Sequence, residues 1–312
     1  MSMIKLMKIM LVLPLALLAN SVSQAGKIWY VNARSGSDFN SGFSSWAAKA
    51  TIQAAVDASM DGDTILVAPG TYLPIETNNK AITIQSLSDA FDTIIDGEGT
   101  SRRCVTARCD SCDICTNSVV IGFTLQNGEA CLPLLYKGEG GGCVEGGSYR
   151  DCILLNGVGA GGGNAASAVL ENCFIIGGYA YNGGNVLCSI VRNCTMIGGY
   201  AEHNGGAYYN CAVYNSICYG NDSGWRWGAD KGTSYQVGSW NWGPLVEAYN
   251  GEEKYVYKGD PNFVDVANGD YRLAAGSPCI DAGDNSYVTT PSDLLGNIRI
   301  ANGTVDIGCC EY

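Results

Sequence analysis

An internal repeat of about 21 residues runs through the middle of this chain. Pairs of glycines mark it, and the pairs begin 21, 21 and 22 residues apart, at Gly141, Gly162, Gly183 and Gly205. A short apolar run keeps register with the glycines. It begins at Cys152, Cys173, Cys194 and Ser216, and an Asp or Asn precedes each of these residues. Two landmarks that recur in register indicate a solenoid whose units stack on one another.

The composition of the repeat decides which solenoid it is. Helical repeats need roughly 33 residues or more and few glycines, and a leucine-rich repeat needs a ladder of Leu that is not present here. Each unit instead holds short β-prone runs separated by Gly, Asn and Asp, which are typical of strands and turns. Parallel crossovers are almost always right-handed. We therefore predict an all-β fold, a right-handed parallel β-helix built from three-strand coils.

The stacking predicts what the repeated residues do. Equivalent side chains of successive coils lie above one another, so we expect Cys152, Cys173 and Cys194 to form one inward ladder. Packing is favoured over disulfides between coils, because buried Cys acts as a small hydrophobe and three stacked thiols cannot all pair. The chain has 15 Cys, so at least one thiol is unpaired in a monomer. The Asn before a rung suits a left-handed corner with stacked amide hydrogen bonds.

The N-terminus and the charge point to an exported protein. Lys5 and Lys8 precede an apolar run, and Ser23-Gln24-Ala25 forms a small-x-small cleavage site, so residues 1–25 are predicted to be a signal peptide. No later segment is apolar enough to cross a membrane. The net charge of −12 gives no electrostatic reason to bind nucleic acid. These features predict a secreted or cell-surface location.

Residues 26–312 are predicted to form a single β-helix domain with specialised ends. Residues 26–72 make an N-terminal cap and first coil, with an amphipathic helix inside 44–60 that buries Ile52, Ala55, Val56 and Ser59. Coils follow over 73–222. An aromatic insert that leaves the helix as a loop or hairpin occupies 223–258, and C-terminal coils with a closing motif occupy 259–312.

Two groups of aromatic residues are candidate ligand-binding sites. In register, Tyr179 stacks with Tyr200 and Tyr181 with His203, which could line a groove for a sugar. The insert contributes Trp225, Trp227, Trp240 and Trp242, whose flat apolar faces suit a glycan. The alternative for both groups is plain packing: a stack for its own sake, or indoles folded over the helix flank.

The sequence predicts no catalytic residue, no metal and no cofactor. Residues 109–115 hold a C-x-x-C-x-x-C run, which could bind zinc or an iron–sulfur cluster, but disulfides that staple a loop are favoured in an exported protein. A polysaccharide lyase needs a strong base, and the central coils offer only Arg150 and Arg192. A glycosidase needs two facing carboxylates, and no convergent pair is evident.

Both ends of the mature chain resemble known exported proteins. Residues 30–72, YVNARSGSD…TIQAAVDASMDGDTILVAPGTY, are similar to the N-terminal segment of pectin-lyase-like β-helix proteins. The segments GDPNFVDVANGDYRLAAGSPCIDAGDN and DLLGNIRIANGTVDIGCCEY resemble the C-terminal part of bacterial proteins of the choice-of-anchor Q and polymorphic-outer-membrane-repeat type. The resemblance implies a secreted or surface β-helix and carries no shared catalytic motif. Relatives tend to have Ala-Tyr where this chain has Cys309-Cys310.

We therefore expect a non-enzymatic secreted or cell-surface protein, adhesive or glycan-binding, whose partner is a polysaccharide or cell-surface glycan. Two alternatives stay open. One is a carbohydrate-active enzyme, either a polysaccharide lyase or a glycoside hydrolase. The other is an inert structural module of a surface layer.

Overall fold

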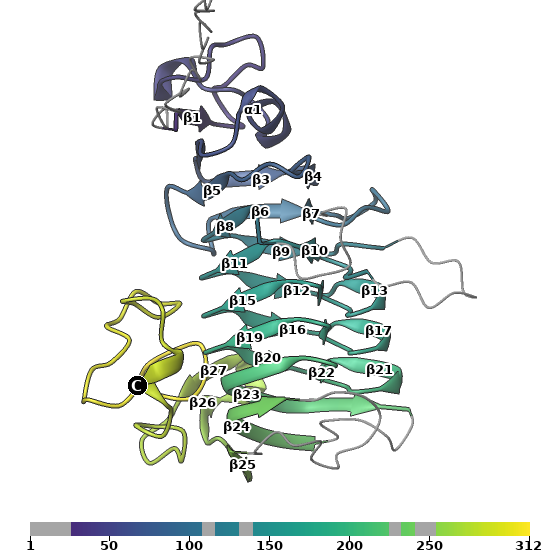
Figure 1. Ribbon diagram of the computed structural model, residues 1–312, viewed down its shortest axis with the longest axis vertical. Coiled ribbons are helices and arrows are strands. Elements are labelled where there is room, and N and C mark those ends of the chain that lie inside the picture. The colour runs from purple at the N-terminus through teal and green to yellow at the C-terminus, as the bar shows by residue number, and fades with distance from the viewer. Residues whose placement is uncertain (1–25, 108–115, 131–139, 225–231, 241–253) are drawn as a thin grey trace, which may run out of the picture.

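The computed structural model describes residues 26–107, 116–130, 140–224, 232–240 and 254–312, with the backbone alone for 232–240 and 254–258. The fold is the predicted right-handed parallel β-helix, whose coils stack along one long axis with the N-terminal end at the top of Figure 1. The predicted signal peptide lies outside the described residues. No helix in the described part of the chain is long and apolar enough to cross a bilayer.

The N-terminal end is capped by a short helix, as predicted. The helix α1 (Ile52–Ala58) begins after Thr51, whose hydroxyl accepts a hydrogen bond from the backbone N–H of Ala54 and so satisfies one free donor of the first turn. Its apolar face is buried against the first coil, and the neighbouring Ser59 is buried with it. A single 3₁₀ turn, η1 (Ser45–Ala47), precedes it. The strand β1 (Ile28–Val31) pairs in parallel with β2 (Thr64–Val67) and begins the first ladder.

The first coils below the cap are the less regular ones. Their strands are β3 (Gly70–Tyr72), β4 (Ile75–Glu76), β5 (Thr83–Ser86), β6 (Thr93–Asp96), β7 (Val105–Ala107), β8 (Val119–Ile121) and β9 (Thr124–Gln126). Each pairs in parallel with its equivalents in adjacent coils.

The central coils follow the 21-residue repeat. Their strands are β10 (Val144–Gly146), β11 (Ser148–Arg150), β12 (Ile153–Leu155), β13 (Val158–Gly161), β14 (Ala165–Ala166), β15 (Val169–Glu171), β16 (Phe174–Ile176), β17 (Tyr179–Asn182), β18 (Val186–Leu187), β19 (Ile190–Arg192), β20 (Thr195–Ile197), β21 (Tyr200–Asn204) and β22 (Tyr208–Tyr209). In one coil the three sides are β14, then β15 with β16, then β17. Asn172 divides the second side, because its backbone adopts a left-handed conformation with φ of 50°.

The glycine pairs are required by close approach of the backbone. Gly162 has φ of 75°, which an L side chain rarely adopts. A Cβ at Gly163 would lie 2.1 Å from the carbonyl oxygen of Gly184 in the next coil. A Cβ at Gly162 would likewise lie 2.0 Å from the carbonyl oxygen of Ala165, so both positions exclude a side chain by close contact and the first also by its backbone conformation.

The predicted Cys ladder lies in the core. Cys152, Cys173 and Cys194 are fully buried free thiols, and the register pairs the residue after each with its equivalent in the next coil. The Asn corner, which consists of Asp151, Asn172, Asn193 and Asn215, lies beside them and forms side-chain hydrogen bonds between coils. Asn172 Nδ2 donates to Asp151 Oδ1 at 3.1 Å, and Asn215 Nδ2 donates to Asn193 Oδ1 at 3.0 Å. Both features were predictable from the spacing of the landmarks.

The lower end of the β-helix changes from parallel to antiparallel pairing. The long strand β23 (Ala212–Ser223) pairs in parallel with β19, β20 and β21 of the coil above it. The backbone of β24 (Gly232–Trp240) then runs antiparallel to β23, and β25 (Lys254–Lys258) runs antiparallel to β24. Part of the predicted aromatic insert thus extends the sheet.

Residues 259–312 are predicted above to include further coils, and the structure differs. They contain an antiparallel pair, β26 (Phe263–Asp265) and β27 (Asp270–Leu273), and two 3₁₀ turns, η2 (Val266–Asn268) and η3 (Asn285–Tyr287). The antiparallel strand β24 covers the lower edge of β23, so that edge is not available to another parallel coil. This closing segment, as we call residues 259–312, lies beside the lower coils instead (Figure 1).

Candidate functional site

The four aromatic residues predicted from the coils come together on the outer side of β17 and β21. Tyr179 pairs in register with Tyr200, and their rings stack with centroids 5.8 Å apart. The rings of Tyr181 and His203 stack at 5.1 Å with planes only 10° apart. The three Tyr side chains are 40–49% exposed. We call these four residues the aromatic face.

The strand pattern explains why these side chains point outward. Side chains alternate between the two faces of a strand. Ala180 and Ala201, which alternate with the aromatic residues, are fully buried in the core. One face of each strand therefore packs the β-helix, and the opposite face presents the aromatic rings to solvent.

A carboxylate that the sequence analysis did not single out completes the aromatic face. The register between β17 and β21 shifts by one residue, which makes room for the exposed Glu202. The hydroxyl of Tyr179 donates a short hydrogen bond to the Glu202 carboxylate, and this interaction raises the pKa of Tyr179. The 22-residue spacing between the last two glycine pairs was the available signal, since it shows one extra residue in this coil.

The imidazole of His203 is oriented by its neighbours on the same strand pair. Asn204 Nδ2 lies 2.6 Å from His203 Nδ1 and 3.0 Å from Asn182 Oδ1. An amide nitrogen can only donate, so Nδ1 is the acceptor in this contact.

The aromatic stack ends at β17, because the coil above it has no aromatic residue at the equivalent positions. In the register between β13 and β17, Val158 lies opposite Tyr179, and Ala160 is the residue opposite Tyr181. Ala160 has a single side-chain carbon and cannot cover a phenol ring. The side of the Tyr181 ring that faces β13 therefore lies next to a small residue.

The two Arg considered for lyase chemistry have a structural role. Arg150 Nε lies 3.3 Å from one carboxylate oxygen of Glu171, and Arg192 Nη1 lies 3.5 Å from the other. The hydroxyl of Thr289 in the closing segment donates to the same carboxylate at 2.7 Å. Glu171 thus joins two adjacent coils and the closing segment, and both guanidinium groups are engaged with it.

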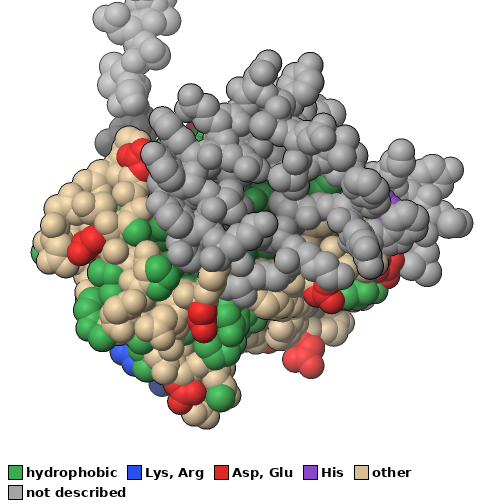
Figure 2. Space-filling view, turned by 90° about the horizontal axis from the view of Figure 1, so that it is seen from below, with side chains coloured by type: hydrophobic (Ala, Val, Ile, Leu, Met, Phe, Trp, Pro, Cys, Tyr) green, Lys and Arg blue, Asp and Glu red, His purple; other side chains and the backbone are tan. Residues whose placement is uncertain are grey.

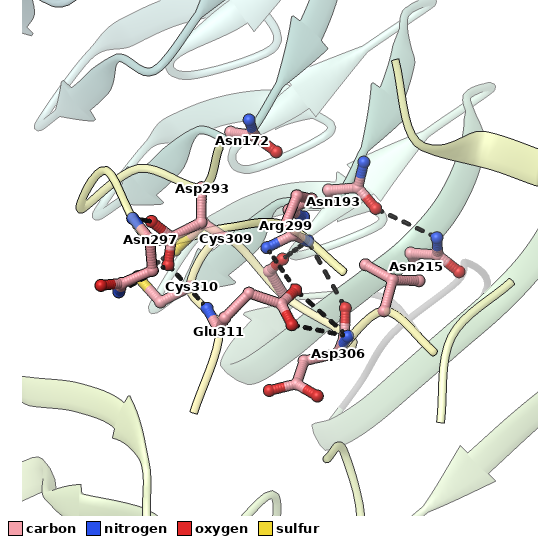
Figure 3. Close-up of polar contacts among 12 residues, drawn as sticks. Asn172, Asn193, Asn215, Asp293, Asn297, Arg299, Asp306, Cys309, Cys310 and Glu311 are labelled. Carbon is pink, nitrogen blue, oxygen red and sulfur yellow. Dashed lines mark hydrogen bonds and ion pairs between the residues drawn. The ribbon is translucent and has the colours of Figure 1, made fainter. Parts of the chain in front are cut away.

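A second cluster of charged groups lies inside the closing segment (Figure 3). Arg299 is 1% exposed, and its Nη1 lies 3.2 Å from Glu311 Oε1. Its Nη2 donates to the carbonyl oxygens of Asp306 and Gly308. Burial raises the pKa of Glu311 to about 7. Sequence analysis described the segment around these residues only by its resemblance to known proteins. It did not predict that Arg299 and Glu311 form a pair.

Asp293 organises the turn beside this cluster. Its carboxylate accepts backbone hydrogen bonds from Asn297 at 2.7 Å and from Glu311 at 2.8 Å. The main chain is thereby held on both sides of Arg299. The cluster stabilises the closing segment and offers no exposed pair of acids.

The remaining predicted sites fall mainly outside the described residues. Trp225, Trp227 and Trp242 are among these, and Trp240 is the last residue of β24, of which only the backbone is described. The whole C-x-x-C-x-x-C run lies in 108–115, which is also outside them. Over the described ranges no group of three or more His, Cys, Asp or Glu could hold a metal ion.

The charge of the surface follows the acidic composition. Figure 2 shows acidic side chains at several separate places on the lower end of the molecule and a few basic ones at one edge. The net charge of the chain is −12. A net negative charge of this size disfavours the approach of an anionic polymer.

The comparisons with known proteins add one structural likeness. A crystal structure of pectate lyase Pel9A is similar to this chain, with a TM-score of 0.35 and 14% sequence identity over 93% of this chain and 97% of that one. No protein-family model matches the sequence. No curated protein matches it either. The function of the chain is therefore argued from its own residues.

Proposed function

We propose that this protein is a secreted or cell-surface glycan-binding protein, and that the aromatic face is its contact surface. The single observation that carries the proposal is the exposed double stack of Tyr179 on Tyr200 and of Tyr181 on His203. Large aromatic side chains that stay exposed in an ordered stack, with polar groups beside them, are typical of interaction sites.

The chemistry of the aromatic face suits a sugar. A pyranose has an apolar face that stacks on an aromatic ring, and hydroxyl groups around its rim that need donors and acceptors. The ring of Tyr181 next to Ala160 supplies the stacking surface. The Glu202 carboxylate and the imidazole of His203 supply polar groups for the rim. Because the rings are already stacked on each other, binding would order few side chains, and ordering each one costs roughly 0.5–1.5 kcal/mol.

The acidic surface narrows the class of glycan. A polyuronate such as pectate carries a negative charge on each sugar, and the net charge of −12 would repel it. We therefore propose a neutral or basic polysaccharide as the ligand. The roles of the Trp residues of the insert remain a prediction, and the same binding assay tests them.

The proposal also includes the route of export. We propose that residues 1–25 are removed during secretion, so that the mature chain begins at Gly26. N-terminal sequencing of the protein recovered outside the producing cell would test this. A protein that stays inside the cell with Met1 retained would contradict it.

The binding test is a glycan array followed by titration calorimetry with the best neutral and basic hits. Tyr181→Ala should weaken binding about 10-fold or more, because it removes the ring at the end of the aromatic stack, next to Ala160. Trp46→Ala is the matched control, since Trp46 is a highly exposed aromatic residue on the N-terminal cap. Binding that survives Tyr181→Ala and fails only in Trp variants of the insert would move the site to 223–258.

The enzymatic alternative is read from the same samples. Reducing-sugar release or a new ultraviolet absorbance from unsaturated products would identify a hydrolase or a lyase, respectively. No binding to any glycan, together with normal stability, would favour the structural module.

A further inference from the structure

Two adjacent cysteines near the end of the chain form a pair unlike the other described thiols. The Sγ atoms of Cys309 and Cys310 are 3.5 Å apart and share a hydrogen bond. Cys309 is buried, whereas Cys310 is partly exposed. We propose that this pair is a site of reversible oxidation, at which the two neighbouring residues close into a disulfide ring when they meet a small-molecule disulfide.

The surroundings of the pair favour a thiolate. The hydrogen bond with Cys310, the contact with Thr195 and the positive charge of the buried Arg299 guanidinium together hold the pKa of the Cys309 thiol below its ordinary value. The same hydrogen bond raises the pKa of Cys310. The pair therefore ionises at Cys309, and the hydrogen bond between the two sulfurs lets the remaining proton pass from Cys310 to Cys309. The minor form, which has its charge on the partly exposed Cys310 sulfur, is the one that meets a disulfide from solvent.

The thiols of the core ladder are different. Cys152 and Cys173 of the ladder, and Cys211 elsewhere in the core, are buried, and burial raises the pKa of each thiol. Thiols in such surroundings are inert, because the thiolate is the reactive form. Geometry therefore separates a packing role for the ladder from a chemical role for Cys309 and Cys310.

The proposed reaction is a thiol–disulfide exchange in two steps. The Cys310 thiolate attacks one sulfur of a disulfide R–S–S–R, forms a mixed disulfide and expels one thiolate RS⁻. Cys309, as thiolate, then attacks the Cys310 sulfur and expels the second RS⁻. The one proton of the pair, on Cys309 at that stage, passes to the first RS⁻ as Cys309 becomes the thiolate, and the second RS⁻ takes a proton from solvent. One disulfide is reduced to two thiols, and two protein thiols are oxidised to one disulfide.

The ring should be easy to open again. Consecutive Cα atoms are about 3.8 Å apart across a trans peptide, which is shorter than the roughly 4.4–6.8 Å usual for a disulfide. Strained disulfides are more readily reduced than relaxed ones. The pair is therefore suited to switch between two states and not to act as a permanent link.

Ring closure would also change how the closing segment is held. The backbone N–H of Cys309 donates to Thr195 Oγ1 of the central coils at 3.1 Å, and its carbonyl accepts from Leu294 at 3.1 Å. A new ring between residues 309 and 310 must reorient this backbone. We expect the oxidised closing segment to be attached less firmly to the coils.

The chain offers a clean readout for this inference. No Lys or Arg follows Arg299, so trypsin releases residues 300–312 as one peptide, and Cys309 and Cys310 are its only cysteines. The folded protein is equilibrated in buffers with an increasing ratio of glutathione disulfide to glutathione. It is then quenched in acid, and its free thiols are blocked with a maleimide under denaturing conditions. After digestion with trypsin, the mass of the peptide is measured by mass spectrometry.

The expected result is a peptide without maleimide and about 2 Da lighter than the dithiol form, which appears as the ratio rises and disappears after transfer to excess glutathione. A peptide that carries two maleimides at every ratio would overturn the proposal. A peptide that stops at one glutathione and one maleimide, or that is linked to another peptide, would overturn it as well.

Variants locate the chemistry. Cys309→Ser and Cys310→Ser should each abolish the lighter form, and Cys310→Ser should also slow formation of a glutathione adduct at position 309, because the exposed sulfur is gone. Cys188→Ser, at a partly exposed cysteine of a coil corner, is the control and should leave the peptide unchanged. The wild-type experiment needs no variant, so a variant that fails to fold leaves the test intact. The outcome is independent of glycan binding.

Discussion

The central coils and the closing segment are built in different ways, although they pack against each other. In the coils, one set of residues recurs every 21 or 22 positions, and each side chain contacts its own equivalent above and below. In the closing segment each contact occurs once, as in the buried pair of Arg299 and Glu311. A repeat distributes its stability over many similar interfaces, whereas a single-copy structure concentrates it in a few.

The two regions meet at the Asn corner. Asn172 Nδ2 donates to Thr290 Oγ1 at 2.7 Å, and Asn215 Nδ2 donates to the carbonyl of Asp284 at 2.9 Å. Apolar contact accompanies them, since Ile197 and Ile217 of the coils form one cluster with Phe263, Leu273 and Ile307. The corner residues thus satisfy the turns of the coils and also dock the closing segment.

The largest effect should come from the closing segment, at Arg299. Arg299→Ala leaves Glu311 buried without its partner and removes two hydrogen bonds to carbonyl groups. Breaking one side of a buried ion pair costs about 3–5 kcal/mol. We expect the free energy of unfolding to fall by that amount in urea denaturation followed by circular dichroism.

The control for that prediction is Arg272→Ala. Arg272 pairs with Asp270, but its side chain is 62% exposed, and exposed pairs contribute little to stability. If the two variants lose equal free energy of unfolding, the buried cluster contributes no more to stability than an exposed ion pair does. The contrast between the two regions would then disappear.

A smaller loss is expected inside the coils, at Asn185. Its Oδ1 accepts from the backbone N–H of Gly178 at 3.0 Å and from Asn164 at 2.8 Å, and its Nδ2 donates to Asn221 at 3.0 Å. Asn185→Ala leaves these buried groups unsatisfied, which costs about 1–3 kcal/mol. Denaturation in urea measures it, with the exposed Asn268→Ala in η2 as the control. A loss as large as that of Arg299→Ala would mean that the repeat concentrates its stability too.

The pH dependence distinguishes the regions in another way. Burial raises the pKa of Glu311 from 4.5 to about 7, so the folded protein binds this proton more tightly than the unfolded chain. This contribution to stability is complete below the unfolded pKa and is lost as pH rises through about 7. Stability should therefore decline between pH 5 and pH 8.

Glu311→Gln provides the matched measurement, because the amide keeps the shape of the protonated acid and cannot titrate. Other buried acids also titrate, so the quantity to compare is the difference between wild type and variant across the pH range. That difference should grow in favour of the variant as pH rises. Parallel curves would show that Glu311 has an ordinary pKa.

The same contrast explains what could be predicted from sequence. The fold, the Cys ladder, the Asn corner and the pairing of Tyr179 with Tyr200 all follow from counting along the repeat, because equivalent positions must stack. The contact between Thr290 and Asn172 joins residues 118 positions apart and occurs once, so no sequence repeat predicts it. The C-terminal coils were predicted from strand-like segments after the insert and from a resemblance, neither of which reveals that β24 closes the edge of β23.

The smallest effect tests whether the ladder is truly interchangeable from rung to rung. In the Cys ladder, Cys194 Sγ accepts from the backbone N–H of Cys173 at 3.3 Å and donates to the carbonyl of Arg192 at 3.0 Å. One coil below, Ser216 Oγ makes the same two contacts, with Cys194 at 3.1 Å and Tyr214 at 2.7 Å. The chain therefore already contains a serine in this environment.

Cys194→Ser should keep both hydrogen bonds and lose only the larger apolar sulfur, so we expect a change of at most about 1 kcal/mol in the free energy of unfolding. Cys194→Ala is the comparison, because it removes the acceptor for the Cys173 amide and leaves a small void, and it should cost more. If the serine variant proves less stable than the alanine variant, then the cost of burying a hydroxyl exceeds the gain from its two hydrogen bonds. Ser216 would then be tolerated only because its coil is the last in the parallel stack, beside which the antiparallel strands begin.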